Sequence, residues 1–198
     1  LFDATVDGSE YPRYDPRSGK WGAELYDAKL RNLSRALRDA GGPRMTPPDI
    51  LAVQEVENLR TLSALRHRIG KRRYPYGALT AVPGSAVQVA LLSRYRVTEV
   101  RAHALAHRGF DTLRDILEVR LRVPPGEPLV VYVNHWKSKH GGARATASAR
   151  ELAARALSRL AGAAIRQKPA PLVVAAGDFN TELASGIALG SRPTSAHS

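Results

Sequence analysis

Three apolar segments of this chain each run directly into a short group of polar residues that can carry chemistry. Each segment has the length and composition of a buried β-strand, so its last residues deliver functional groups to one edge of a sheet. Active sites are commonly built at such an edge. The three groups are specific when taken together. They are Gln54-Glu55 after Leu51-Ala52-Val53, Asn134-His135-Trp136-Lys137-Ser138-Lys139 after Val131-Tyr132-Val133, and Gly177-Asp178-Phe179-Asn180 after Val173-Val174-Ala175-Ala176.

The rest of the hydrophobic pattern alternates between the period of a helix and that of a strand. Residues 1–23 show no sustained period and predict a surface loop. The apolar runs 129–133 and 172–176 predict buried strands. Interspersed helices and strands indicate a layered α/β fold. The predicted helices cover 26–40, 59–69 and 146–164, and the predicted strands cover 50–53, 87–92, 117–123, 129–133 and 172–175.

The composition describes a globular chain with a strong excess of positive charge. The formal net charge is +12 and 43% of the residues are hydrophobic. Charge of this size steers phosphate-bearing ligands and indicates a polyanion partner, although an arginine-rich composition can also reflect a GC-rich genome. The chain contains no cysteine, which excludes disulfides, a thiol nucleophile and a Cys-ligated metal. No apolar run approaches the ~20 residues that a membrane-spanning helix needs.

The three polar groups, in this order, resemble those of the endonuclease/exonuclease/phosphatase superfamily, the metal-dependent fold of pancreatic-type deoxyribonuclease. In that family a Gln-Glu pair, an Asn-His followed by Lys-Ser-Lys, and a Gly-Asp-Phe-Asn each end a strand. The opening Leu1-Phe2-Asp3 is similar to the end of a segment that supplies the family's first functional asparagine. The resemblance covers residues 1–182 and points most closely to bacterial, often secreted, nuclease-like members. It implies one partial domain over residues 1–198, an α/β sandwich of two packed mixed sheets flanked by helices.

The resemblance implies roles for four residues at the strand ends. Glu55 corresponds to the family's metal-binding glutamate, and Mg²⁺ prefers carboxylate oxygen ligands. His135 corresponds to the histidine that contacts the scissile phosphate, where an imidazole stabilises charge on phosphoryl oxygens. Asp178 and Asn180 correspond to the pair that orients the attacking water and the phosphoryl oxygens or the metal, so Asp178 is also a candidate metal ligand. A carboxylate can position or deprotonate water, and an amide adds hydrogen bonds without negative charge.

Other residues near these motifs have two interpretations each. Arg114 aligns with a basic residue that the family often carries, and it is either a phosphate contact or a surface arginine. Lys137 and Lys139 are candidate contacts to backbone phosphate, or plain solvated lysines. Glu57 is expected at the surface or at the start of the following helix rather than as a metal ligand. Asn58 is expected to cap that helix.

The function that the resemblance implies is metal-dependent hydrolysis of the DNA or RNA backbone by in-line attack of water. The expected metal is Mg²⁺, with Mn²⁺ or Ca²⁺ as alternatives, and contacts mainly to backbone phosphate imply low sequence preference. One alternative is a phosphatase of the same superfamily that acts on inositol phosphates or phospholipid head groups. Another is a non-catalytic nucleic-acid-binding remnant that keeps the fold and the basic surface.

The end of the chain departs from the family pattern. In the family, a further aspartate and a Ser-Asp-His follow Gly-Asp-Phe-Asn, and that histidine activates water. Here Ser195-Ala196-His197-Ser198 lacks the aspartate, so no base role is assigned to His197. We expect a chain truncated at both ends, whose last residues pack poorly and whose activity is weak or lost, because a general base typically contributes ~10²–10⁴-fold to the rate. We also expect a monomer that is secreted or periplasmic, with the cytoplasm as the alternative.

Overall fold

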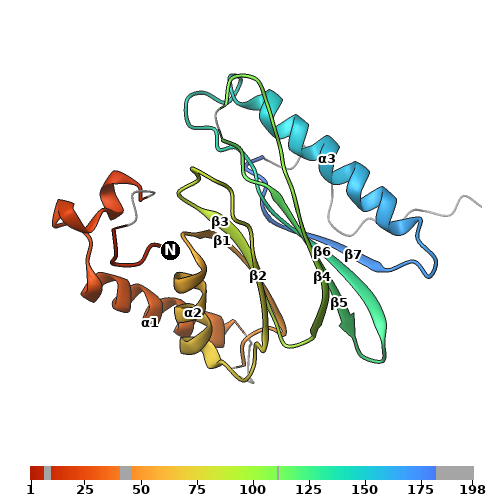
Figure 1. Ribbon diagram of the computed structural model, residues 1–198, viewed down its shortest axis with the longest axis horizontal. Helices are drawn as coiled ribbons and strands as arrows, with labels where there is room; N and C mark the ends of the chain where they lie inside the picture. The colour runs from red at the N-terminus through yellow and green to blue at the C-terminus, as the bar shows by residue number, and fades with distance from the viewer. Residues whose placement is uncertain (7–9, 41–45, 111, 182–198) are drawn as a thin grey trace, which may run out of the picture.

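The computed structural model describes residues 1–6, 10–40, 46–110 and 112–181 of the 198-residue chain. Its elements form two β-sheets that pack face to face, with helices on both outer sides (Figure 1). The α/β sandwich predicted from the sequence is therefore confirmed. The predictions for His197 and for the packing of the final residues lie outside the described residues.

The seven strands divide into a sheet of three and a sheet of four. The strands are β1 (Ile50–Val56), β2 (Tyr76–Leu79), β3 (Gln88–Ser93), β4 (Arg96–His103), β5 (Ile116–Val123), β6 (Glu127–His135) and β7 (Leu172–Asp178). The smaller sheet has the order β1-β3-β2 and is antiparallel. The larger sheet has the order β4-β5-β6-β7, and its last two strands run parallel.

The main hydrophobic core lies between the two sheets. Side chains alternate between the two faces of a strand, so every second residue of β5 and β6 points into this core. Val89 and Leu91 of β3 meet them from the smaller sheet and are fully buried. The contributing residues of β5 and β6 are Leu117, Val119, Leu121, Leu129, Val131 and Val133.

Two helices cover the outer face of the smaller sheet (Figure 1). They are α1 (Ala23–Asp39) and α2 (Leu59–Gly70), and Leu65 of α2 is buried in the cluster that joins both helices to β1 and β3. Asn58 caps the start of helix α2, and its side-chain oxygen accepts a hydrogen bond from the Thr61 backbone amide at 2.9 Å. The predicted cap is confirmed.

The third helix, α3 (Ala147–Ile165), covers β6 and β7 on the outer face of the larger sheet. Its alanine residues bring the helix close to the strands, and the hydroxyl of Tyr132 donates to the carbonyl of Leu160 at 3.1 Å. Among the helices of the described ranges, none is both long and apolar enough to cross a membrane.

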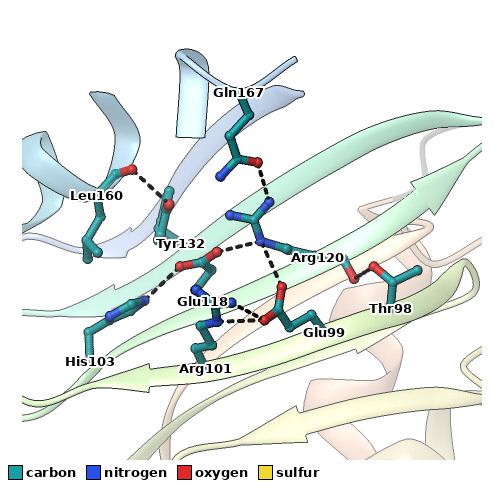
Figure 2. A network of polar contacts seen from close by, with 9 residues as sticks. All are labelled: Thr98, Glu99, Arg101, His103, Glu118, Arg120, Tyr132, Leu160 and Gln167. Carbon is teal, nitrogen blue, oxygen red and sulfur yellow. Dashed lines mark hydrogen bonds and ion pairs between the residues drawn. The ribbon is translucent and has the colours of Figure 1, made fainter. Parts of the chain in front are cut away.

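Beside α3, the same outer face carries a network of charged side chains (Figure 2). The carboxylate of Glu118 on β5 is buried, with His103 Nε2 at 2.7 Å and Arg120 Nε at 2.7 Å. Arg120 also donates to Gln167 Oε1 at 2.8 Å, just beyond the end of α3. The network thus ties β4, β5 and the segment after α3 together.

The first 23 residues are not the surface loop that the sequence predicts. Phe2 is buried, and its ring stacks on Tyr14 with 4.4 Å between the centroids. The indole nitrogen of Trp21 donates to the carbonyl of Asp3 at 2.7 Å. Scattered aromatic residues therefore anchor this segment, and hydrophobic periodicity does not detect such anchors. The segment contains two short 3₁₀ helices, Pro12–Tyr14 and Pro16–Ser18.

Two strands were missed, and one differs in burial from its prediction. The missed strands are β2, which has only four residues, and β4, which is rich in charged side chains. Strand β7 forms as predicted, but the prediction that it is buried is wrong: none of its residues is buried, and Leu172 is 61% and Val174 46% exposed. Within the described residues, β7 is an edge strand, and Leu172 and Val174, which are paired with the inward-facing Leu129 and Val131, are exposed on its inner face.

Candidate active site

Two of the candidate residues come from neighbouring parallel strands that end at one edge of the larger sheet. His135 is the last residue of β6, Asp178 is the last residue of β7, and the two are paired in register. Paired residues project to the same face, which here is the inner face that also carries Val133. The Trp136 amide donates to the carbonyl of Asp178 at 2.9 Å and extends the ladder past the strand ends. The strand pairing therefore places His135 and Asp178 side by side.

Glu55 comes from the smaller sheet, at an irregular point of β1. The register of β1 against β3 shifts between Val53 and Val56, which indicates a β-bulge. Within it Glu55 has φ 56°, in the left-handed region. Among the described residues, Asn180 at φ 49° is the one other non-glycine residue with positive φ. Bulges re-aim side chains, and left-handed backbone costs an L-residue roughly 1–2 kcal/mol. Both strained positions are candidate site residues.

The environment of His135 connects these residues electrostatically. The side chain is buried, and within the described chain its Nδ1 has no hydrogen-bond partner. Burial, and then the nearby Arg114 guanidinium, hold the pKa of His135 below its usual 6.5. The carboxylates of Glu55 and Asp178 act in the opposite direction without overcoming the burial. His135 is therefore a neutral imidazole at neutral pH, and a bound ligand or water would satisfy its buried nitrogen.

The loop after β7 is braced against the loop after β6. The backbone amide of Asn180 donates to Asp178 Oδ1 at 2.9 Å, and its side-chain Nδ2 donates to the carbonyl of Trp136 at 3.0 Å. The rings of Phe179 and Trp136 meet edge to face, with 4.8 Å between centroids. These contacts use the donors of Asn180, while its Oδ1 has no donor among the described residues. The arrangement fixes Asp178 and Asn180 as a unit with one amide oxygen left to accept.

Close backbone approach at Gly177 makes this bracing possible. A Cβ at Gly177 would lie 1.9 Å from the carbonyl oxygen of Asn134, so a larger residue does not fit. Asn134 is buried, its Nδ2 donates to the carbonyl of Tyr132 at 2.9 Å, and its Oδ1 accepts from the Trp136 indole at 3.0 Å. Asn134 and Gly177 therefore support the site without facing it as reacting groups.

The basic candidates differ in how closely the structure associates them with the site. Arg114 is half-buried and close enough to His135 to lower its pKa. Lys137 is also half-buried, with its Nζ 5.4 Å from the ring centroid of Phe110. Lys139 is exposed on the following turn. Of the three, Arg114 has the described position best suited to a phosphate contact, and the roles of both lysines stay predictions.

Two further acidic residues, Asp3 and Glu57, lie together near the end of β1. Glu57 was expected at the surface or at the start of the following helix; it directly precedes the cap residue Asn58, but it is buried, and its Oε2 accepts from the backbone amide of Asp3 at 2.6 Å. Asp3 is also buried, and it accepts from the Thr5 amide at 2.7 Å and from Asn58 Nδ2 at 3.3 Å. The opening segment folds over the end of β1 and buries both side chains. The presence of Asp3 in the opening motif was the one available signal for its position.

The donor set suits one class of metal ion. Glu55 and Asp178 offer carboxylate oxygens from opposite sheets, and Asn180 offers an amide oxygen. No group of three or more His, Cys, Asp or Glu residues that could hold a metal occurs within the described ranges. Zn²⁺ takes at least three protein ligands, whereas Mg²⁺ binds through one or two carboxylates and keeps several waters. The donors within the described ranges therefore suit Mg²⁺ better than Zn²⁺.

One comparison with known proteins identifies the family of this chain. Residues 1–187 match the profile of the Endonuclease/Exonuclease/phosphatase family. No curated protein matches the chain in sequence.

Several solved structures share the fold. TDP2 from Caenorhabditis elegans matches with a TM-score of 0.61 and 18% identity over 87% of this chain. The human nocturnin catalytic domain, solved with a bound sulfate anion, matches with a TM-score of 0.55 and 20% identity over 78%. A β-hairpin deletion mutant of beta toxin from Staphylococcus aureus gives 0.57 and 19% over 82%. The matches span 46%, 58% and 64% of those chains, so this chain corresponds to roughly half to two thirds of each.

Proposed function

Because this chain belongs to the Endonuclease/Exonuclease/phosphatase family, whose members are hydrolases, we propose that it is a Mg²⁺-dependent phosphodiesterase that cleaves the backbone of DNA or RNA. The observation that carries the proposal is the in-register pairing of His135 with Asp178 at the ends of β6 and β7, with the buried Nδ1 of His135 left without a partner among the described residues. Glu55, Asp178 and Arg114 all influence the pKa of the buried His135.

Each of these groups has a role in hydrolysis of a phosphodiester by in-line attack of water. Asp178 orients the attacking water, and it is itself held by the Asn180 amide. The neutral imidazole of His135 donates a hydrogen bond to a phosphoryl oxygen as charge develops there. Arg114 binds a non-bridging oxygen. A divalent cation bound by Glu55 and Asp178 would neutralise the charge that builds up in the transition state.

The positive charge of the chain supports a polynucleotide as the substrate. A net charge of +12 raises the local concentration of a polyanion and speeds its association. Contacts through Arg114 to phosphate oxygens carry no information about base identity. We therefore propose cleavage with little sequence preference.

The test is nicking of supercoiled plasmid by the purified chain in Mg²⁺ and in EDTA. We expect nicking in Mg²⁺, none in EDTA, and a loss of about 10²-fold or more in Glu55→Gln. Glu127→Gln, a substitution at an exposed residue with the same change of charge, serves as the control and should leave the rate unchanged. Nicking that survives both EDTA and Glu55→Gln would rule the proposal out. Release of phosphate from inositol phosphates, without nicking, would favour the phosphatase alternative.

A further inference from the structure

A group of arginines surrounds a hollow on the outer surface of the two helices that cover the smaller sheet. Arg31, Arg35 and Arg38 come from α1, and Arg68 comes from the last turn of α2. Together with Ser34, they line a space of about 320 Å³. Helices α1 and α2 lie on the opposite side of the sandwich from α3 (Figure 1). We refer to this feature as the arginine hollow.

The charges of the arginine hollow are only partly balanced by the described protein around it. Asp27 is the one carboxylate paired with its arginines in the described ranges, and its two oxygens hold Arg31 and Arg68. Arg35 and Arg38 have no ion-pair partner among the described residues. Two of the four guanidinium groups therefore share one carboxylate, while Arg35 and Arg38 keep their planar forks of donors free of ion pairs within the described ranges, although Asp39 stands four residues after Arg35 on α1.

The spacing along α1 makes this arrangement costly for the helix. Arg31 and Arg35 stand four residues apart and Arg35 and Arg38 three apart, so their side chains are neighbours on one helical face. Like charges at these spacings destabilise a helix by roughly 0.2–0.5 kcal/mol per pair. The Asp27–Arg31 pair offsets part of this repulsion, and an anion between the side chains would reduce the rest.

We propose that the arginine hollow binds a phosphate group of a nucleic-acid backbone, outside the active site. Arginine forks match the tetrahedral oxygens of phosphate in a bidentate manner, and the hollow is large enough for one phosphate with part of its sugar. The choice of nucleic acid as the source rests on the proposed function. The hollow would then hold a stretch of polynucleotide that is not being cleaved.

The test measures binding without hydrolysis. A fluorescent 30-nucleotide single-stranded DNA is titrated in EDTA at several salt concentrations, with wild type, Arg35→Gln/Arg38→Gln and a control variant. The control is Arg155→Gln/Arg159→Gln, which removes the same charge from the exposed face of α3. We expect the hollow variant to bind roughly tenfold more weakly, and its salt slope to fall by about 0.7 for each phosphate that it no longer neutralises. The control should change by less than about twofold.

Two further measurements distinguish a nucleic-acid phosphate from a free phosphate, and a loss of binding from a loss of folding. Titration with inorganic pyrophosphate asks whether a free phosphate uses the same arginines, and thermal unfolding checks that both variants fold. Equal losses in the two variants would overturn the proposal, and so would a loss confined to pyrophosphate. Since EDTA prevents metal-dependent cleavage, this result is independent of plasmid nicking. Nicking together with equal losses would keep the proposed function and reject the arginine hollow.

Discussion

At the scale of single residues, the candidate site depends on backbone conformations that cost free energy. Asn180 and Glu55 both have positive φ, but the short polar side chain of asparagine tolerates this region better than glutamate does. The cost is therefore concentrated at Glu55, inside the bulge of β1. Strain of this kind persists where the surrounding structure over-determines it, which is common at functional sites.

Replacing Glu55 by glycine or by alanine separates the carboxylate from the backbone strain. Both variants lose the carboxylate, but only glycine adopts φ near +56° without strain. We expect Glu55→Gly to have a free energy of unfolding about 1 kcal/mol higher than that of Glu55→Ala. Urea denaturation followed by circular dichroism measures the difference. Equal stabilities would show that the strain is relieved in the alanine variant by a shift of β1.

The buried imidazole of His135 predicts a pH dependence with a defined sign. The folded chain holds the pKa of His135 below its usual 6.5. At a pH between the folded pKa and 6.5, the unfolded chain therefore binds more protons than the folded chain. The associated stabilisation is complete above pH 6.5 and is lost as the pH falls through the folded pKa. An NMR titration in phosphate-free buffer should give a midpoint for His135 below 6.5, with His135→Asn to assign the signal. A midpoint at or above 6.5 would mean that Glu55 and Asp178 outweigh burial.

The sequence motif selected candidate site residues at strand ends, but it did not predict their environments. The three strand-end groups identified Glu55, His135 and Asp178 because each follows an apolar run. Burial of Glu57 was missed because it depends on the opening segment folding back over β1, a contact between residues 54 positions apart. The positive φ of Glu55 is equally invisible in a sequence, since it results from the pairing of β1 with β3.

At the scale of elements, predictability followed the strength of the periodic pattern. Helices α1, α2 and α3 were predicted close to their observed bounds because each has an apolar face that packs against a sheet. Strand β4 was missed because none of its residues is buried and a register shift between Val97 and Glu99 interrupts the alternation, so the segment has no regular apolar pattern. Its pairing with β5 stabilises it, and periodicity within one segment carries no information about that partner.

The parallel pair of β6 and β7 depends on a glycine at the site edge. We expect Gly177→Ala to lower the free energy of unfolding by about 2–4 kcal/mol, because its Cβ would lie 1.9 Å from the Asn134 carbonyl and φ is 136°. Gly19→Ala is the matched control: φ is 70°, nothing lies within 4 Å of the new Cβ, and the expected cost is about 1 kcal/mol. Similar costs for both would indicate that β7 shifts away from β6 at little expense.

The network on β4 and β5 predicts a second effect on stability (Figure 2). Glu118→Ala leaves His103 and Arg120 without their shared carboxylate, and their side chains are only 25% and 20% exposed. We expect a loss of about 2–4 kcal/mol in the free energy of unfolding, measured by urea denaturation. Glu127→Ala, at an exposed position of β6, should change it by less than about 0.5 kcal/mol. A loss as small as in this control would mean that water replaces the carboxylate.

At the scale of the whole molecule, the site exists only because two separate sheets meet. Glu55 is supplied by the smaller sheet, and His135 and Asp178 by the larger, so no single layer holds the donor set. The interlocking core of β3, β5 and β6 fixes the distance between the layers. A cation bound between Glu55 and Asp178, as we propose, would therefore be coupled to the folding of the whole sandwich, because the unfolded chain does not bring the two carboxylates together.

This coupling predicts that Mg²⁺ stabilises the folded chain even in the absence of substrate. A ligand that binds only the folded state at ten times its Kd adds about 1.4 kcal/mol to the free energy of unfolding. For a chain of 198 residues, this corresponds to a rise in Tm of about 3–6 °C. Thermal unfolding in Mg²⁺ and in EDTA measures the shift, which should vanish in Glu55→Gln and persist in Glu127→Gln. If the rise in Tm with Mg²⁺ is the same in Glu55→Gln as in the wild type, the cation binds elsewhere on the molecule. The stabilisation by Mg²⁺ would then not come from the candidate active site.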